Sequence, residues 1–397
     1  MSKVTCLKFA STSIDPQSES PLFCLPGEIR NQIWEYALTP YEDANRAYSA
    51  STCYARPGFT APRTSAVGLL RACKSIYSEA WYLPWITAEL CFYLTATARR
   101  PPYVETVPEV QRILNHLHEQ GTDTSVRQVR VFAQLCELET GFHLQTILRM
   151  KHFRPREITV TIRHTDFWHW EIDEWLRVGG TWVQICRFPE TVKVIRVEFE
   201  SLERKKVQVD DIAQQAVERW EFAGANGVVY SAKRGEDEGG KAIGEMEVTR
   251  WTGGSTWGKR RWIRDETQPG KLDYYIKTVV WRVKEDKDDL PHSFESLRVT
   301  SGQKLTASIG YITEHELKTL GTKRVGSQDE NKPMEELIEE VRRKRAHNMN
   351  WWHREWERNQ ESQDGEPGEG HGENEINYPI WLRRRLSASG LARQLRR

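Results

Sequence analysis

The segment GGSTWGKR, residues 253–260, has a spacing typical of phosphate-binding loops. Gly253, Gly258 and Lys259 satisfy the pattern GxxxxGK, in which backbone N–H groups and a lysine receive phosphate oxygens. That chemistry needs Ser or Thr at the next position to hold magnesium, and Arg260 stands there instead. Hairpin signals surround the segment, and no amphipathic helix follows it. We therefore expect a glycine turn between two strands.

The segment HTDFWHWEID carries side chains of the type that binds metals, namely His164, Asp166, His169 and Asp173. The two histidines lack the i, i+4 spacing of an HExxH zinc helix, and the aromatic residues between them are typical of a packed core. His353, in WWHREW, has no second histidine four residues later. We expect no metal and no cofactor.

Nucleophilic chemistry has no sequence signature either. A GxSxG elbow is absent, and the seven cysteines are scattered without a CxxC pair, at Cys6, Cys24, Cys53, Cys73, Cys91, Cys136 and Cys186. Scattered cysteines in a large chain indicate reduced thiols in the cytosol or nucleus. We expect a protein that is not an enzyme, and only a constellation formed in space would change that expectation.

Composition indicates a folded protein without a strong field of either sign. The 397 residues are 38 % hydrophobic and 28 % charged, with a net charge of +1, so no overall charge attracts nucleic acid or a membrane. Sixteen tryptophans favour a substantial core or an interface. The N-terminal segment has no apolar run of signal-peptide length, and no run is long enough to span a bilayer. We expect a soluble protein of the cytoplasm, the nucleus or both, with no membrane partner.

The N-terminal quarter reads as two helical segments separated by an insertion. Residues 1–20 form a polar leader, and a helix follows between Pro26 and Pro40, with Glu28 at its positive end. A turn-rich insertion covers 39–65. A second helical period then runs over 69–83, and ELCFYL (89–94) reads as a short buried strand.

The next region, 96–320, changes from helices alternating with strands to antiparallel signals. VRQVRVFA (126–133), REITVTIRH (156–164) and VKVIRVEFE (192–200) read as strands one β-α unit apart, with Val131, Val160 and Val197 at corresponding positions. WEFAGANGVVYSA has Asn-Gly between two apolar runs, which predicts a hairpin. The fold class is therefore mixed, α+β with α/β units and a partly parallel sheet.

The last segments read as a linker over 321–333, a long helix over 334–360 and a disordered tail over 361–397. The tail is first acidic and Gly-rich, then rich in arginine. Arginines and aromatic residues together are typical of single-strand nucleic-acid binders, but the acidic loop between the two basic runs favours neutralisation within the tail. Nucleic-acid binding by the tail stays the weaker alternative.

Two motifs in the first quarter resemble a known family. LPGEIRNQIWEYAL (25–38) resembles the LPxEIRNxIYxxAL motif, and LLRACKSIYSEAWYL (69–83) resembles LLxxCRxIYxEAxxL, of F-box-like proteins of filamentous fungi. The resemblance covers about 23–95 and implies an F-box-like helical region at 21–95. It implies that the N-terminal helix docks a Skp-type adaptor of a cullin ubiquitin ligase and that the rest of the chain captures a protein substrate. Carried over by position, the docking residues are Leu25, Pro26, Ile29, Ile33 and Leu38.

Two interpretations of this helix stay open. Its apolar residues either dock a partner or form the first layer of the chain's own core. In the second case, the chain is a fungal interaction or regulatory protein with no link to ubiquitin. The burial of Ile29, Ile33 and Leu38 separates the two interpretations.

Overall fold

The computed structural model describes residues 14–15, 17–102, 104–122, 125–284, 294–300, 310–319 and 339–347. The chain divides into two compact units, Met1–Glu330 and Asn331–Arg397. The described part of the second unit is helical over 339–347, inside the helix predicted for 334–360. The predicted linker (321–333), the tail (361–397) and most of the leader lie outside the described residues. The sheet and both candidate sites belong to the first unit.

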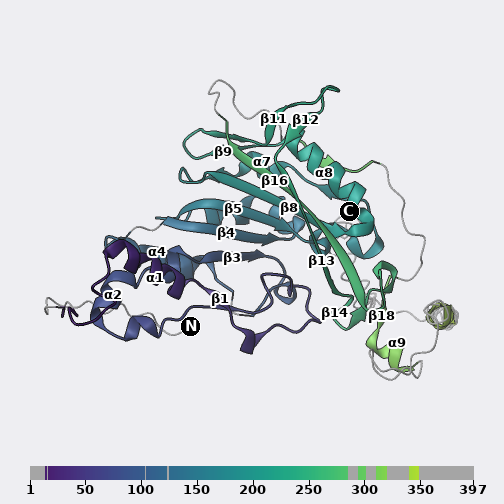
Figure 1. Ribbon diagram of the computed structural model, residues 1–397. Helices are drawn as coiled ribbons and strands as arrows, with labels where there is room; N and C mark the ends of the chain where they lie inside the picture. Colours follow the sequence, from purple (N-terminus) through teal and green to yellow (C-terminus); the bar gives the residue numbers. More distant parts are fainter. Residues whose placement is uncertain are drawn as a thin grey trace, which may run out of the picture. The chain divides into compact units, whose positions relative to one another are not determined.

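A nine-stranded mixed sheet organises the first unit (Figure 1). Its order is β3-β4-β5-β8-β16-β10-β9-β7, and β13 also pairs with β16. The strands are β3 (Glu89–Leu94), β4 (Ser125–Ala133), β5 (Arg154–Ile162), β7 (Arg187–Phe188), β8 (Val194–Leu202), β9 (Glu221–Gly224), β10 (Val229–Ser231), β13 (Met246–Gly254) and β16 (Lys271–Val283). Strands β3, β4, β5 and β8 are parallel, whereas β16 is antiparallel to β8, β10 and β13.

The parallel half of the sheet confirms the predicted β-α units. Val131, Val160 and Val197 are direct register partners across β4, β5 and β8. Their side chains are fully buried. Successive residues of a strand point to opposite faces, so these valines mark one apolar face of the sheet.

Helices connect the strands, and those between β3 and β9 contribute buried side chains to the core under this apolar face. The helices are α1 (Gly27–Leu38), α2 (Lys74–Ala80), α3 (Leu83–Ile86), α4 (Val107–Glu119), α5 (Leu135–Leu138), α6 (Phe142–Leu148), α7 (Thr181–Ile185), α8 (Lys206–Arg219) and α9 (Glu314–Thr319). Figure 1 shows α8 along β8 and β16, the strands with which it makes contact. Helix α4 begins with a capping box of Thr106 and Glu109, which satisfies two N–H groups of its first turn. None of the helices in the described ranges has the length and apolar character needed to cross a membrane.

The antiparallel half confirms the hairpins expected after residue 220. Strands β9 and β10 are joined through Asn226-Gly227, where Gly227 has a φ of 80°. The GGSTWGKR segment is also a hairpin, formed by β14 (Thr256–Trp257) and β15 (Arg260–Arg261). Gly258 and Lys259 have φ values of 59° and 60°. Positive φ at both central residues is the requirement of a type I′ turn, the common two-residue turn of hairpins. The predicted glycine turn is therefore confirmed.

Short strand pairs complete the unit around the main sheet. They are β1 (Tyr41–Glu42) with β2 (Arg63–Thr64), β11 (Lys233–Glu236) with β12 (Ala242–Gly244), β6 (Arg177–Val178) with β17 (Leu297–Arg298), and β15 with β18 (Ile312–Thr313). The pair β1–β2 closes the insertion predicted for 39–65. Strand β3, expected within the helical region 21–95, is part of the main sheet, because it pairs with β4 over its whole length.

The buried face of β8 gives a test of the core. Ile195 has no exposed surface, whereas Val207, at the start of α8, is 79 % exposed. Ile195→Ala is expected to lower the free energy of unfolding by about 2–5 kcal/mol through lost burial and a residual cavity. Val207→Ala is the control and should change it by less than about 0.5 kcal/mol. Urea unfolding measures both, and equal midpoints for the two variants would contradict this placement of β8.

Candidate functional site

An ion pair joins the two motifs that carry the family resemblance. Arg30 on α1 contacts Glu79 on α2 through two hydrogen bonds, of 3.1 Å from Nε and 2.8 Å from Nη2. The Trp34 indole N–H donates to the same carboxylate at 2.9 Å. The hydrogen bond from Arg30 holds the pKa of Glu79 below its usual value. These contacts fix α1 on α2 in one orientation.

The inner face of α1 belongs to a small core of its own. Trp34 and Leu38 pack with Ile76, Ala80 and Leu83 from α2 and α3. This cluster is separate from the core beneath the main sheet. Leu38, a docking residue by resemblance, therefore contributes to the chain's own packing, and its side chain has no exposed surface.

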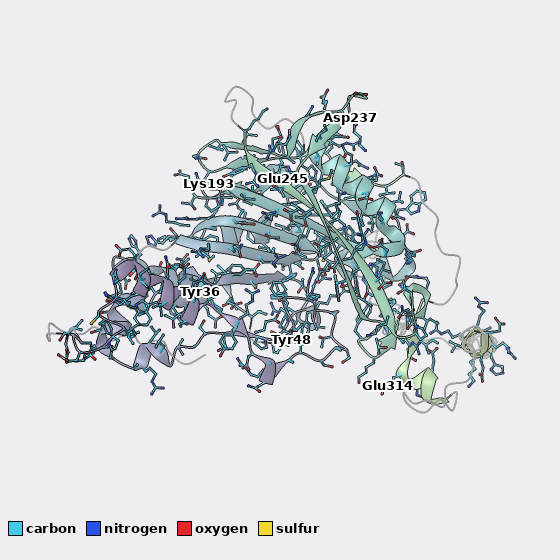
Figure 2. All side chains as sticks on the ribbon, in the orientation of Figure 1. Tyr36, Tyr48, Lys193, Asp237, Glu245 and Glu314 are labelled. Carbon is cyan, nitrogen blue, oxygen red and sulfur yellow. The ribbon has the colours of Figure 1, made fainter. Side chains whose placement is uncertain are left out.

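The outer face of α1 presents apolar side chains to solvent. Leu25 is 36 % exposed and Ile29 is 43 % exposed, while Pro26 is also exposed. Ile33 is partly buried against the small core. Tyr36, labelled in Figure 2, is 86 % exposed and lies two helical turns after Ile29 on the same side. Ile29 and Tyr36, with Leu25 and Pro26 just before the helix and Ile33 at the border of the small core, thus form an apolar stripe along α1.

A second candidate region lies on the other face of the main sheet, which is polar. Arg130 on β4 binds Glu89 on β3 at 2.8 Å and Glu198 on β8 at 2.7 Å. Thr161 on β5 lies between them, accepting from Arg130 at 2.9 Å and donating to Glu198 at 2.7 Å. The charges on this face therefore neutralise one another across four parallel strands.

The insertion covers this polar face. Its Phe59 packs edge-on against Phe132 of β4, with ring centroids 5.0 Å apart. Its Arg56 forms an ion pair of 2.9 Å with Glu200, and both side chains are nearly buried. Burial raises the pKa of Glu200, although Arg56 opposes this effect. The insertion is therefore a structural cover of the sheet that supplies a counter-charge.

Two adjoining cavities lie past the carboxyl ends of β3 and β5. Ligands of open α/β sheets bind at this edge, because the loops that follow the strands converge there. The inner cavity has a volume of about 40 Å³ and is lined by Ala50, Thr52, Cys53, Ala55, Arg56, Arg163, His164, Thr165, Glu200, Trp251, Gly254, Trp257 and Tyr274. The outer cavity has a volume of about 410 Å³, within the usual range for small-molecule sites, and is lined by Ser51, Thr52, Cys53, Tyr54, Ala98, Arg99, Thr165, Trp170, Glu171, Trp257, Gly258, Arg260 and Trp262.

Three tryptophans form one wall of the outer cavity. The centroids of Trp170 and Trp262 are 4.4 Å apart, and those of Trp257 and Trp262 are 5.7 Å apart. Arg99 lies over the Trp170 ring at 5.6 Å from its centroid. The wall is therefore aromatic, with the Trp170 and Trp262 rings tilted by 48° and Arg99 at its side.

Unpartnered buried polar atoms gather in the walls of these cavities. Within the described residues, no hydrogen-bond partner exists for Nε and Nη1 of Arg56, Nε2 of His164, Oγ1 of Thr165, or the indole nitrogens of Trp170 and Trp262. Buried polar groups in native proteins are nearly always hydrogen-bonded, so each exception needs an explanation such as a water, an ion or a ligand. Their concentration around one place makes the two cavities a candidate binding site.

The two aspartates of HTDFWHWEID form ion pairs within the protein. Asp166 binds Arg163 at 2.6 Å, and Asp173 binds Arg204 at 2.7 Å and Lys205 at 2.9 Å. Within the described part of the chain, no group of His, Cys, Asp and Glu side chains is placed to hold a metal ion.

Two titratable side chains in the cavity walls are held in their neutral forms. Burial lowers the pKa of His164 to about 3, so its imidazole is neutral at physiological pH. Burial also raises the pKa of the Cys53 thiol, which keeps it protonated. The six cysteines within the described residues are free thiols. These walls present hydrogen-bond donors and aromatic faces, without an activated nucleophile.

The sequence did not indicate that the cavity residues meet, because they come from segments spread between residues 50 and 274. Cys53 and Arg56 lie in the insertion, Thr165 follows β5, and Trp257 lies in the β14–β15 hairpin. One signal was present: polar residues alternate with apolar ones in ITVTI and VEFE, which indicates a second, polar face of the sheet.

Two threonines test the significance of the unpartnered atoms. Thr165→Val removes a hydroxyl without a partner, so the free energy of unfolding should stay unchanged or rise by up to about 1 kcal/mol. Thr161→Val is the matched variant, and it leaves Arg130 and Glu198 without their shared hydroxyl. It should lower the free energy of unfolding by about 1–3 kcal/mol. Chemical denaturation measures both variants. Equal losses of the free energy of unfolding would contradict the assignment of a hydrogen-bonded hydroxyl to Thr161 and an unpartnered one to Thr165.

The buried imidazole of His164 makes stability depend on pH. Its pKa falls from 6.5 to about 3 on burial, so between these values the unfolded chain binds a proton that the folded chain does not. Acid therefore destabilises the protein, by up to about 1.4 kcal/mol per pH unit below pH 6.5. In His164→Gln, the free energy of unfolding should fall less steeply between pH 6 and pH 4.5. Parallel curves for the two proteins would show that His164 titrates normally.

No known protein family, curated protein or solved structure matches the chain. The apolar stripe of α1 and the paired cavities are two of the surfaces that the described residues present.

Proposed function

We propose that this protein is a non-enzymatic interaction module that docks a partner through the outer face of α1. The observation that carries the proposal is the exposure of Ile29 on α1, and of Leu25 just before it, while Trp34 and Leu38 hold the other side of the helix. We propose further that the partner is a Skp-type adaptor of a cullin ubiquitin ligase, in the cytoplasm or nucleus. The sheet unit would then hold a protein substrate.

The anchoring of α1 favours docking without a large loss of entropy. The Arg30–Glu79 pair and the Trp34 hydrogen bond fix the helix before any partner arrives. A partner therefore does not have to order α1, and a preorganised surface binds more tightly for the same buried area. Apolar side chains one and two turns apart, such as Ile29, Ile33 and Tyr36, are the usual anchors when a helix enters a groove.

The resemblance of the two motifs to F-box-like proteins supports a Skp-type adaptor as the partner. The residues that match the motifs have two different roles in this chain. Arg30 and Glu79 pair with each other, so they hold the helices together. Leu25, Pro26 and Ile29 remain at the surface, where an adaptor would contact them. The alternative is an interaction or regulatory protein that uses the same stripe for a partner outside the ubiquitin system.

A charge placed in the stripe tests this proposal. Ile29→Asp should weaken binding of a purified Skp-type adaptor at least about 30-fold, because a central apolar anchor contributes about 2 kcal/mol or more. Asn31→Asp is the matched control: it adds the same charge to the same helix at an exposed position outside the stripe. Titration calorimetry measures the affinities, and thermal unfolding checks that both variants keep the fold.

The outcomes separate the two parts of the proposal. If the unmodified protein does not bind the adaptor, the link to ubiquitin ligases is wrong. If the protein binds the adaptor and Ile29→Asp binds it equally well, α1 is not the docking element.

A further inference from the structure

We propose that the two adjoining cavities form a binding site for a small aromatic carboxylate. The carboxylate would occupy the inner cavity, and the flat body would lie in the outer cavity against the tryptophan wall. This site contains neither Arg30 nor Glu79, and its walls come from elements other than α1 and α2. The inference therefore goes beyond the docking function and does not rest on it.

The walls of the inner cavity call for a group that accepts hydrogen bonds. Arg56 uses Nη2 to bind Glu200, while its Nε and Nη1 have no partner among the described residues. Thr165 Oγ1 and His164 Nε2 are unpartnered in the same walls. A carboxylate offers only acceptors, in about four positions, and it forms charge-assisted hydrogen bonds with arginine.

The outer cavity calls for a flat apolar body that carries acceptors at its edge. Trp170, Trp257 and Trp262 supply aromatic surface, and offset or edge-on contact between rings is favourable. The indole nitrogens of Trp170 and Trp262 have no partner within the described ranges, although these side chains are only 6 % and 2 % exposed. They are donors, so they suit a ligand with acceptor atoms.

An organic cation is the other class that tryptophan clusters recognise, and the charges here disfavour it. Arg99 already lies over the Trp170 ring. Arg99 and Arg260 line the outer cavity, where Glu171 lies 3.7 Å from Arg99. Arg56 and Arg163 line the inner cavity, where Glu200 pairs with Arg56 and Asp166 pairs with Arg163, so four arginines stand against three carboxylates. The cavities therefore present an excess of positive charge.

The experiment compares three naphthalene probes that share one body and differ in charge. The full-length protein is titrated with 2-naphthoate, 2-naphthylmethanol and 2-naphthylmethylammonium, and binding is followed by calorimetry and tryptophan fluorescence. We expect saturable binding of the carboxylate, at least about tenfold tighter than that of the neutral or cationic probe, because hydrogen bonds to charged groups exceed neutral ones by a margin of this size.

Variants of the cavity walls locate the bound probe. Thr165→Val and Trp257→Leu should each weaken 2-naphthoate binding about tenfold, through a lost hydrogen bond and a lost aromatic contact respectively. Trp81→Leu is the matched control, because Trp81 is also partly buried but stacks on Tyr77 at the end of α2. Its affinity should equal that of the unmodified protein.

Several results would overturn the inference. Absence of saturable carboxylate binding would mean that the cavities hold water only. Equal or tighter binding of the cationic probe would show that the aromatic wall, and not the donors, selects the ligand. Unchanged affinity in both Thr165→Val and Trp257→Leu would place the bound carboxylate elsewhere on the protein.

Discussion

The covered polar face of the main sheet requires every charge on it to find a partner. Burying an isolated charge is so unfavourable that such groups are paired or neutralised. Arg130 meets this requirement by binding Glu89 and Glu198 on either side of it, and Arg56 meets it for Glu200. Arg56 comes from the insertion. The Arg56–Glu200 pair therefore neutralises a buried charge on the sheet and also holds the insertion against that face.

The cavities follow from this arrangement. Arg56 satisfies Glu200 with one nitrogen, and its remaining nitrogens stay in the wall of the inner cavity without a partner among the described residues. The insertion thus covers the polar face of the sheet, but hydrogen-bond donors without a partner in the described part of the chain remain where the strands end. Edges of this kind carry function in many α/β proteins, because the sheet holds the loops rigidly while their side chains vary.

The N-terminal helices depend on a second charge pair. Arg30 and Glu79 come from the two motifs that resemble F-box-like proteins, and Trp34 donates to the same carboxylate. The motif pattern therefore contains residues of two kinds. Some hold α1 to α2, and others, such as Ile29, remain on the surface. Only the surface residues bear on a partner.

Much of the fold was predictable from the sequence. Local patterns predicted the three parallel strands with Val131, Val160 and Val197 as partners, and they predicted the Asn-Gly hairpin and the glycine turn at Gly258. These features depend on side-chain alternation and on backbone conformations that few residues adopt, and both are properties of a short segment.

Tertiary structure alone decided the sites. A helical period assigns Leu38 and Ile29 to apolar positions, but only the packing of α2 and α3 decides that one is buried and the other is exposed. In the same way, Arg56 and Glu200 are far apart in the chain, and nothing local to either residue indicates the other. The sequence by itself determined the elements and their turns. The pairing of distant charges and the choice of the buried face depend on long-range contacts, which form only when the whole unit folds.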